Sequence, residues 1–201
     1  MSQQQSEELF ASYLAKYGIA SESQYVVNPR SGSNVDFRIT FGAQSVLADV
    51  KEVQEIPKRE GEIIAGRQIR SDLKKLRRKF ETELPACPLI LVTVNGSKGF
   101  FTGLTVVQSM LGSIEVVFRK SDFKQISPLR HSKKGSATFT RRQNTTISGI
   151  LVLTQNLRNS YFGNPYARHP FDGTLFPQTT VYYPKSDAVG DEITVYSRIM
   201  F

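Results

Sequence analysis

Asp36, Asp49 and Lys51 are the residues of this sequence whose types and spacing are best suited to chemistry. Side chains alternate along a β-strand, so Asp49 and Lys51 project from one face of their strand while Ala48 and Val50 project from the other. If the preceding strand pairs with this one as a hairpin, Asp36 comes to lie beside Asp49. Two carboxylates and one ammonium then converge within a few ångströms.

This grouping predicts metal-dependent chemistry on phosphate. Two clustered carboxylates are what a hard divalent cation such as Mg²⁺ requires, together with water molecules and phosphate oxygens. Such a cation would polarise a phosphodiester and lower the pKa of an attacking water, while Lys51 would orient that water or offset the charge on the phosphate. We therefore expect hydrolysis of phosphodiester bonds with Mg²⁺ as the cofactor and Mn²⁺ as its alternative.

Asp36, twelve residues and then Asp49-Val50-Lys51 form a pattern that resembles the D-Xn-(D/E)-X-K signature of the PD-(D/E)XK nuclease superfamily. Val35 stands where the signature has proline. The resemblance implies a restriction-endonuclease-like α/β fold with an αβββαβ core, similar to that of small Holliday-junction resolvases, in which helices flank a central mixed sheet. It also implies that Asp36, Asp49 and Val50 are metal ligands.

The resemblance extends to two further residues that it would place at the active site. In Holliday-junction resolvases and related nucleases, a glutamate on the first helix stands eleven residues before the glycine that ends the helix, as Glu7 does before Gly18. Glu8 is the alternative, and an acidic residue close to a helix N-terminus is also explained by the helix dipole. Gln68 stands where many members carry a glutamine, although Asp72 replaces the tyrosine of RecB-like nucleases.

Hydrophobic periodicity predicts the elements that must position these residues. Helices are expected at 6–17, 66–80 and 102–111, and strands at 35–42, 45–53, 88–94, 113–120 and 148–154. The polar, basic segment 120–146 is expected to be an excursion or flexible loop. We predict a single domain with a core at about 6–154 and a proline- and tyrosine-rich C-terminal extension at about 157–201, which wraps irregularly over the core and ends in a strand.

The helix expected at 66–80 carries seven basic residues against one acidic residue, Asp72. Its default interpretation is the solvated side of an amphipathic helix, and its functional interpretation is contact with phosphates. The net charge of +8 and the pI near 9.6 suit a polyanionic partner. We expect DNA, with RNA as the alternative, and the residues predicted to bind it are Arg67, Arg70, Lys74, Lys75, Arg77 and Arg78.

Composition excludes several other classes of protein. Cys87 is the only cysteine, so one chain can build neither a disulfide nor a cysteine-rich zinc site. His131 and His169 stand in no nucleophile or metal-ligand motif, which leaves a serine or cysteine hydrolase without an obvious base. No apolar run approaches the roughly 20 residues that span a bilayer, and the first residues lack signal-peptide features. We expect a cytoplasmic protein with no membrane partner.

The sequence favours an endonuclease acting on DNA, and the resemblance suggests restriction, repair or mobile-element defence as its setting. Two other functions stay open. One is a non-catalytic nucleic-acid-binding subunit with a nuclease-like fold. The other is a basic structural or assembly protein in which the D-X-K triplet is coincidental. A homodimer or a partner protein is compatible with all three.

Overall fold

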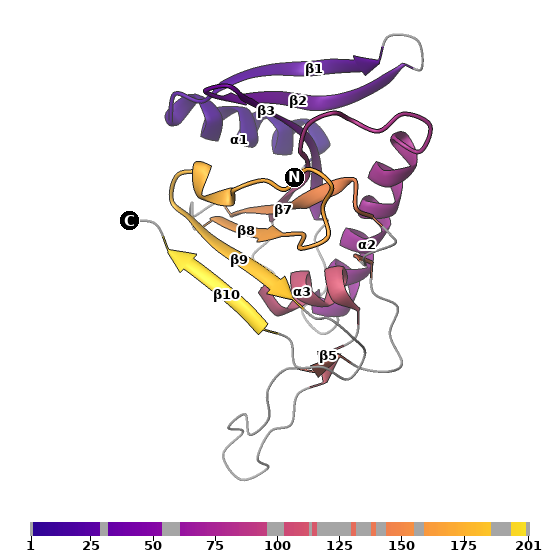
Figure 1. Ribbon diagram of the computed structural model, residues 1–201. Helices are drawn as coiled ribbons and strands as arrows, with labels where there is room; N and C mark the ends of the chain where they lie inside the picture. The colour runs from indigo at the N-terminus through magenta and orange to yellow at the C-terminus, as the bar shows by residue number, and fades with distance from the viewer. Residues whose placement is uncertain are drawn as a thin grey trace.

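The computed structural model describes residues 2–28, 32–53, 61–95, 103–112, 114–115, 130–131, 138–139, 144–154, 159–185 and 194–199. Within these ranges the fold is α/β, with three α-helices, one eight-stranded mixed sheet and one two-stranded sheet (Figure 1). The elements follow in the order α1 (Gln3–Lys16), β1 (Ala20–Asn28), β2 (Ser33–Phe41), β3 (Gln44–Val53), α2 (Gly61–Lys79), β4 (Leu89–Asn95), α3 (Gly103–Leu111), β5 (Ile114–Glu115), β6 (Arg130–His131), β7 (Ile147–Thr154), β8 (Asn159–Gly163), η1 (Gly173–Leu175), β9 (Thr179–Lys185) and β10 (Thr194–Ile199).

The large sheet has the strand order β1-β2-β3-β4-β7-β8-β9-β10. The first three strands form an antiparallel meander, whereas β3, β4 and β7 are mutually parallel at its centre. Parallel neighbours need a crossover connection, and α2 is the helix between β3 and β4. The central position of β4 and β7 explains their short, almost wholly apolar sequences, because both faces of these strands are covered.

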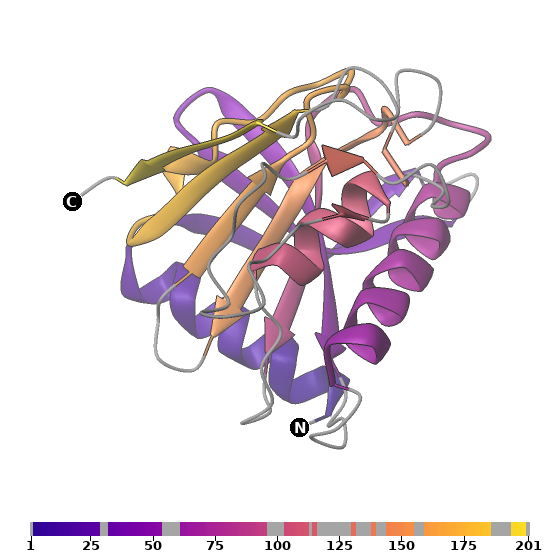
Figure 2. The same ribbon diagram turned by 90° about the horizontal axis from the view of Figure 1, so that it is seen from below.

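Helices cover the two faces of the sheet separately (Figure 2). α1 packs Phe10, Tyr13 and Leu14 against one face, in a cluster that includes alternate residues of β3 and β4. α2 and α3 cover the other face, where α2 buries its apolar stripe of Ile69, Leu73 and Leu76, and Phe80, directly after the helix, joins the same cluster. Asp49 and Lys51 alternate with the α1-facing residues of β3, so they point to the α2 side.

α1 begins earlier than the sequence pattern predicts. Ser2 and Gln5 form a capping box, in which each side chain accepts a hydrogen bond from the other's backbone N–H. The helix therefore begins at Gln3 rather than at residue 6, and Glu7 lies in its second turn. Its end is as predicted, because Gly18 adopts a left-handed φ of 64° directly after the cap residue.

β1 is an edge strand that periodicity did not reveal. It pairs along β2 from Ala20 opposite Thr40 to Asn28 opposite Ser33, but its residues are mostly exposed. A strand with little apolar face to bury lacks the alternation that identifies strands in a sequence. α2 likewise begins at Gly61, five residues before the predicted start.

The expectation that the C-terminal extension is an irregular wrap is wrong for its described part. β8, β9 and β10 continue the large sheet beyond β7. Tyr161, Phe171 and Phe176 join the α1-side core, and the Tyr161 hydroxyl donates to the Ser148 carbonyl at 3.0 Å. A Cβ on Gly173 would lie 2.1 Å from the Tyr161 ring, so this packing requires glycine there. The predicted terminal strand corresponds to β10.

Two predicted segments fall largely outside the described residues. Of the strand expected at 113–120, the structure describes Ile114 and Glu115, which pair with His131 and Arg130 in the small sheet. Most of the loop expected at 120–146 is also outside. None of the helices in the described ranges combines the length and the apolar character needed to cross a bilayer.

Candidate active site

The register of the β2–β3 hairpin brings two carboxylates together. Phe37 pairs with Ala48, so the next positions of the two antiparallel strands, Asp36 and Asp49, stand opposite each other. Lys51 Nζ lies 2.7 Å from Asp49 Oδ2 and 3.7 Å from Asp36 Oδ2. The three side chains therefore meet at one point of the sheet.

The main chain of Val50 completes this grouping. Its carbonyl oxygen accepts a hydrogen bond from Lys51 Nζ at 2.9 Å, and its N–H donates to Asp36 Oδ2 at 2.6 Å. Gln3, in the first turn of α1, donates to the same carbonyl at 2.7 Å. Oxygens of Asp36, Asp49 and Val50 thus surround one cation, the Lys51 ammonium.

Asp49 is the most deeply buried member, with 3% of its side chain exposed. A buried carboxylate is costly unless ion pairs or hydrogen bonds compensate it. Asp49 has two such partners, because Lys79 Nζ lies 2.7 Å from Oδ1 while Lys51 holds Oδ2. Lys79 is the last residue of α2, and in the sequence it is one of seven basic residues of that helix with nothing in its type to single it out.

α2 presents a polar stripe to the site. Gln68, Asp72, Lys75 and Lys79 follow one another at intervals of four, three and four residues, which places them on one side of the helix. Gln68 Nε2 donates to the Glu52 carbonyl at 2.6 Å, so it reaches β3 one residue beyond Lys51. This helical spacing, beside the apolar stripe, is the signal that could have identified Lys79 from the sequence.

Asp72 is a further carboxyl group of the site, although in the sequence it stands out only as a departure from a family pattern. It is buried, and burial raises the pKa of its carboxyl. Lys75, 3.5 Å away, lowers that pKa, as does the charge of Lys51, whereas the charge of Asp49 raises it. Asp72 is therefore electrostatically coupled to the cluster.

The geometry favours Glu7 over Glu8. Gln3 Nε2, which donates to Val50, also donates to Glu7 Oε1 at 2.9 Å. Glu8 is exposed and accepts from Gln4 on the solvent side. The helix dipole favours acidic residues in the first turn of a helix. Glu7 lies beyond the first turn of α1, so the dipole does not explain its position.

The pKa of the Asp36 carboxyl is raised above its ordinary value. Burial is the largest cause, and the negative charges of Asp49 and Glu7 add to it. The Val50 N–H and the Lys51 ammonium oppose the shift without cancelling it. Burial alone would lower the pKa of Lys51, but its contacts with Asp49 and Asp36 outweigh burial, so that pKa is raised and the lysine stays charged.

Whether this site suits a metal depends on its donor atoms. In the described part of the chain, no three His, Cys, Asp or Glu side chains are grouped closely enough to hold a metal ion. The oxygens around Lys51 nevertheless include two carboxylates and a main-chain carbonyl, which are the donors that Mg²⁺ and Mn²⁺ prefer. A side-chain cation already occupies their centre, so the donor set fits a hard cation.

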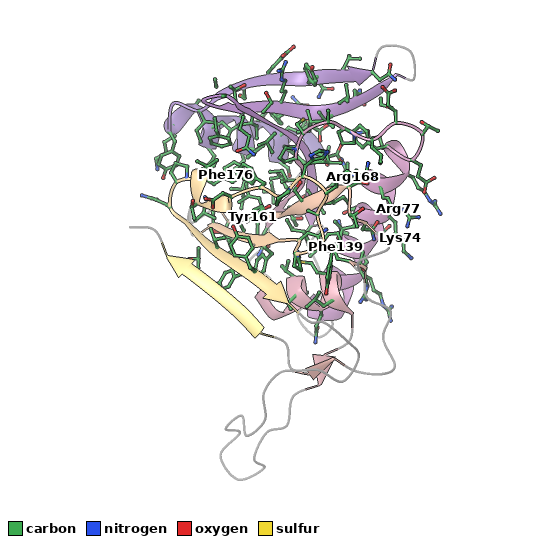
Figure 3. All side chains as sticks on the ribbon, in the orientation of Figure 1. Lys74, Arg77, Phe139, Tyr161, Arg168 and Phe176 are labelled. Carbon is green, nitrogen blue, oxygen red and sulfur yellow. The ribbon has the colours of Figure 1, made fainter. Side chains whose placement is uncertain are left out.

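The six basic residues predicted to bind nucleic acid are spread over two sides of α2. Arg67, Lys74 and Arg78 are exposed on its outer side, and Figure 3 labels Lys74 beside the helix. Lys75 is exposed but pairs with Asp72. The other two, Arg70 and Arg77, are half-buried, and Arg77 lies 3.3 Å from Glu81.

Comparison of the chain with protein-family models, with curated proteins and with solved structures finds no match in any of the three. The function of the chain is therefore inferred from the geometry and charge of these side chains.

The raised pKa of Asp36 predicts a cost to stability at neutral pH. A carboxyl whose pKa is raised on folding stabilises the fold below its ordinary pKa, roughly 3.9, and loses that contribution as the pH rises through the raised value. We expect Asp36→Asn to increase the melting temperature at pH 7 without divalent ions, and the increase to shrink towards pH 4. Glu8→Gln is the matched control, and an Asp36→Asn protein that melts below wild type at pH 7 would contradict the electrostatic account.

Proposed function

We propose that this chain is a metal-dependent nuclease of the PD-(D/E)XK type, acting as an endonuclease on DNA, with RNA as the alternative substrate. The observation that carries the proposal is the convergence of Asp36, Asp49 and the Val50 carbonyl on one cation. Clustered oxygen donors beside a lysine provide both a seat for Mg²⁺ and a positive charge next to it.

Asp36, Asp49 and the Val50 carbonyl would hold the metal ion. When bound, the ion would polarise the phosphodiester and lower the pKa of a coordinated water molecule. A metal ion at these oxygens would displace the Lys51 ammonium from their centre to a position beside them, where it would orient the attacking water or offset charge on the phosphate. Lys79 binds the second oxygen of Asp49 and so helps to orient that carboxylate.

The remaining residues fix the end of β3. Gln3 and Gln68 donate to the carbonyls of Val50 and Glu52 from opposite faces of the sheet. Holding the main chain on both sides of Lys51 limits the positions that its side chain and the Val50 carbonyl can take. Such preorganisation is what electrostatic catalysis requires.

The order of elements supports the same proposal. α1, three antiparallel strands, α2 and β4 follow one another as in the αβββαβ core that the sequence resemblance implies. The basic outer side of α2 lies on the same helix as the polar stripe that faces the cluster. A polynucleotide bound to these basic residues would need to reach round α2 to the exposed edge of the cluster, where Lys51 and Lys79 are about one-third exposed.

The two other functions are less well supported. A basic assembly protein has no need for two carboxylates that share one lysine, because burying such a cluster opposes folding. A non-catalytic binding subunit would keep the basic helix but has little physical reason to retain Asp36 and Asp49. Cleavage assays separate this second case from the proposal.

The first functional prediction concerns Asp49→Asn. The amide keeps the size of the side chain but removes the charge that would hold the metal ion, so cleavage should fall by about three orders of magnitude, equivalent to several kcal/mol. Plasmid and single-stranded substrates are compared in Mg²⁺ and Mn²⁺, with thermal melting as the fold control and Glu8→Gln as the matched variant.

Asp36→Asn serves as a second variant in the same assay, because it is expected to fold at least as well as wild type. Equal cleavage by wild type and both Asn variants would rule out the assigned residues. If wild type itself cleaves nothing in either metal, the non-catalytic binding subunit becomes the better explanation.

The second functional prediction concerns the basic side of α2. Replacing Lys74, Lys75, Arg77 and Arg78 together by Gln should weaken nucleic-acid binding and flatten its dependence on salt. Each lost phosphate contact lowers the slope of log K against log salt by about 0.7–0.9. Lys16→Gln, at the exposed end of α1, is the control for a general loss of charge. An unchanged slope of log K against log salt would show that this side of α2 contacts solvent and not phosphates.

A further inference from the structure

A pocket with a volume of about 340 Å³ opens beside the carboxylate cluster. Residues of β1, β2, β3 and the loop before β4 line it, among them Tyr25, Arg38, Leu47, Phe80, Pro85 and Cys87. Its volume lies at the lower end of the roughly 300–1,000 Å³ that small-molecule sites have. The proposed catalytic roles use none of these residues.

The pocket and the cluster adjoin each other through three elements. On β2, Arg38 follows Asp36 by two positions, and on β3, Leu47 precedes Asp49 by two, so each pair shares a face of the sheet. After α2, the pocket residue Phe80 directly follows Lys79. Two strand positions correspond to about 7 Å, which places the pocket within one or two nucleotides of the cluster.

Arg38 is the cation of this pocket, and the exposed Glu83 on the loop before β4 is the carboxylate that also lines it. Its guanidinium lies over the Tyr25 ring, 5.0 Å from the ring centre, and donates to Ser45 Oγ at 3.2 Å and to the Tyr25 hydroxyl at 3.5 Å. These partners are neutral, and no ion pair found among the described residues includes Arg38. A guanidinium has five N–H donors, so this half-buried cation keeps capacity for an anion.

A half-buried guanidinium in a pocket that has both polar and apolar walls suits a ligand that combines an anion with an apolar part. Guanidinium groups bind phosphate through paired, charge-assisted hydrogen bonds. The planar Arg38–Tyr25 stack and the apolar wall formed by Leu47, Phe80 and Pro85 suit a nucleobase and sugar. A mononucleotide unit combines these two parts.

We propose that this pocket binds one unstacked nucleotide of the polynucleotide, next to the bond that the cluster cleaves, with its phosphate on Arg38. The inference rests on the proposed nuclease function for its choice of a polynucleotide. It assigns Arg38 to substrate binding and the pocket to positioning the chain at Asp36 and Asp49.

Cys87 provides a direct test, because it lines the pocket and is the only cysteine of the chain. Burial raises the pKa of its thiol, so labelling with a thiol reagent is measured at mildly alkaline pH without divalent ions. Deoxyadenosine monophosphate and a short single-stranded oligonucleotide should each slow the labelling several-fold. Deoxyadenosine alone and inorganic phosphate alone should protect less, because each supplies half of the ligand.

Two variants test whether the ligand binds in the pocket. Arg38→Gln should weaken deoxyadenosine monophosphate binding at least about tenfold by calorimetry, since it removes a charge-assisted hydrogen bond. Ala86→Trp, at an exposed position of the wall, should block protection by filling the pocket without disturbing the core. Lys16→Gln, at the exposed end of α1, is the matched control and should bind like wild type.

The outcomes separate this inference from the proposed function. Absence of protection, or equal binding by wild type and Arg38→Gln, overturns the pocket assignment even where Asp49-dependent cleavage is observed. Protection by the mononucleotide but not by the oligonucleotide would show a site for free nucleotides and overturn the link to the polynucleotide. The protein could also cleave no substrate while both ligands protect Cys87 and Arg38→Gln removes that protection. This result would support the assignment of the pocket and contradict the proposed nuclease function.

Discussion

The buried carboxylate of Asp49 is the constraint on which the arrangement of the site depends. Only 3% of this side chain is exposed, and its two oxygens each lie 2.7 Å from an ammonium. One ammonium comes from the same strand and the other from the last residue of α2, so β3 and α2 must keep a fixed relative position. Leaving either oxygen without its partner would bury an uncompensated charge, which typically costs 3–5 kcal/mol.

The same pairing offsets part of the cost of gathering several carboxyl groups at the cluster. Glu7, Asp36, Asp49 and Asp72 bring four carboxyl groups to one region, and Lys51, Lys75 and Lys79 bring three ammonium groups. The raised pKa values of Asp36 and Asp72 show that the lysines compensate these carboxylates only in part. Under the proposed function, this residual cost is relieved when a divalent cation binds.

The central part of the site could be predicted from the sequence because it depends on local geometry. Strand alternation places Asp49 with Lys51, and a single hairpin register places Asp36 opposite Asp49. Lys79 and Asp72 could not be placed in this way, since their contacts depend on how α2 packs across β3. The exposed β1 and the tyrosine-bearing β8 and β9 also lack clear periodicity. Their pairing is decided by neighbours distant in the sequence.

The central claim is that oxygens of Asp36, Asp49 and Val50 form a seat for a divalent cation. Binding of Mn²⁺ to the purified protein, followed by electron paramagnetic resonance without nucleic acid, tests that claim most directly. The account predicts one site in wild type and in Glu8→Gln that is lost or greatly weakened in both Asp36→Asn and Asp49→Asn. Wild-type protein that binds no Mn²⁺ at millimolar concentration, or equal binding by all four proteins, would contradict it.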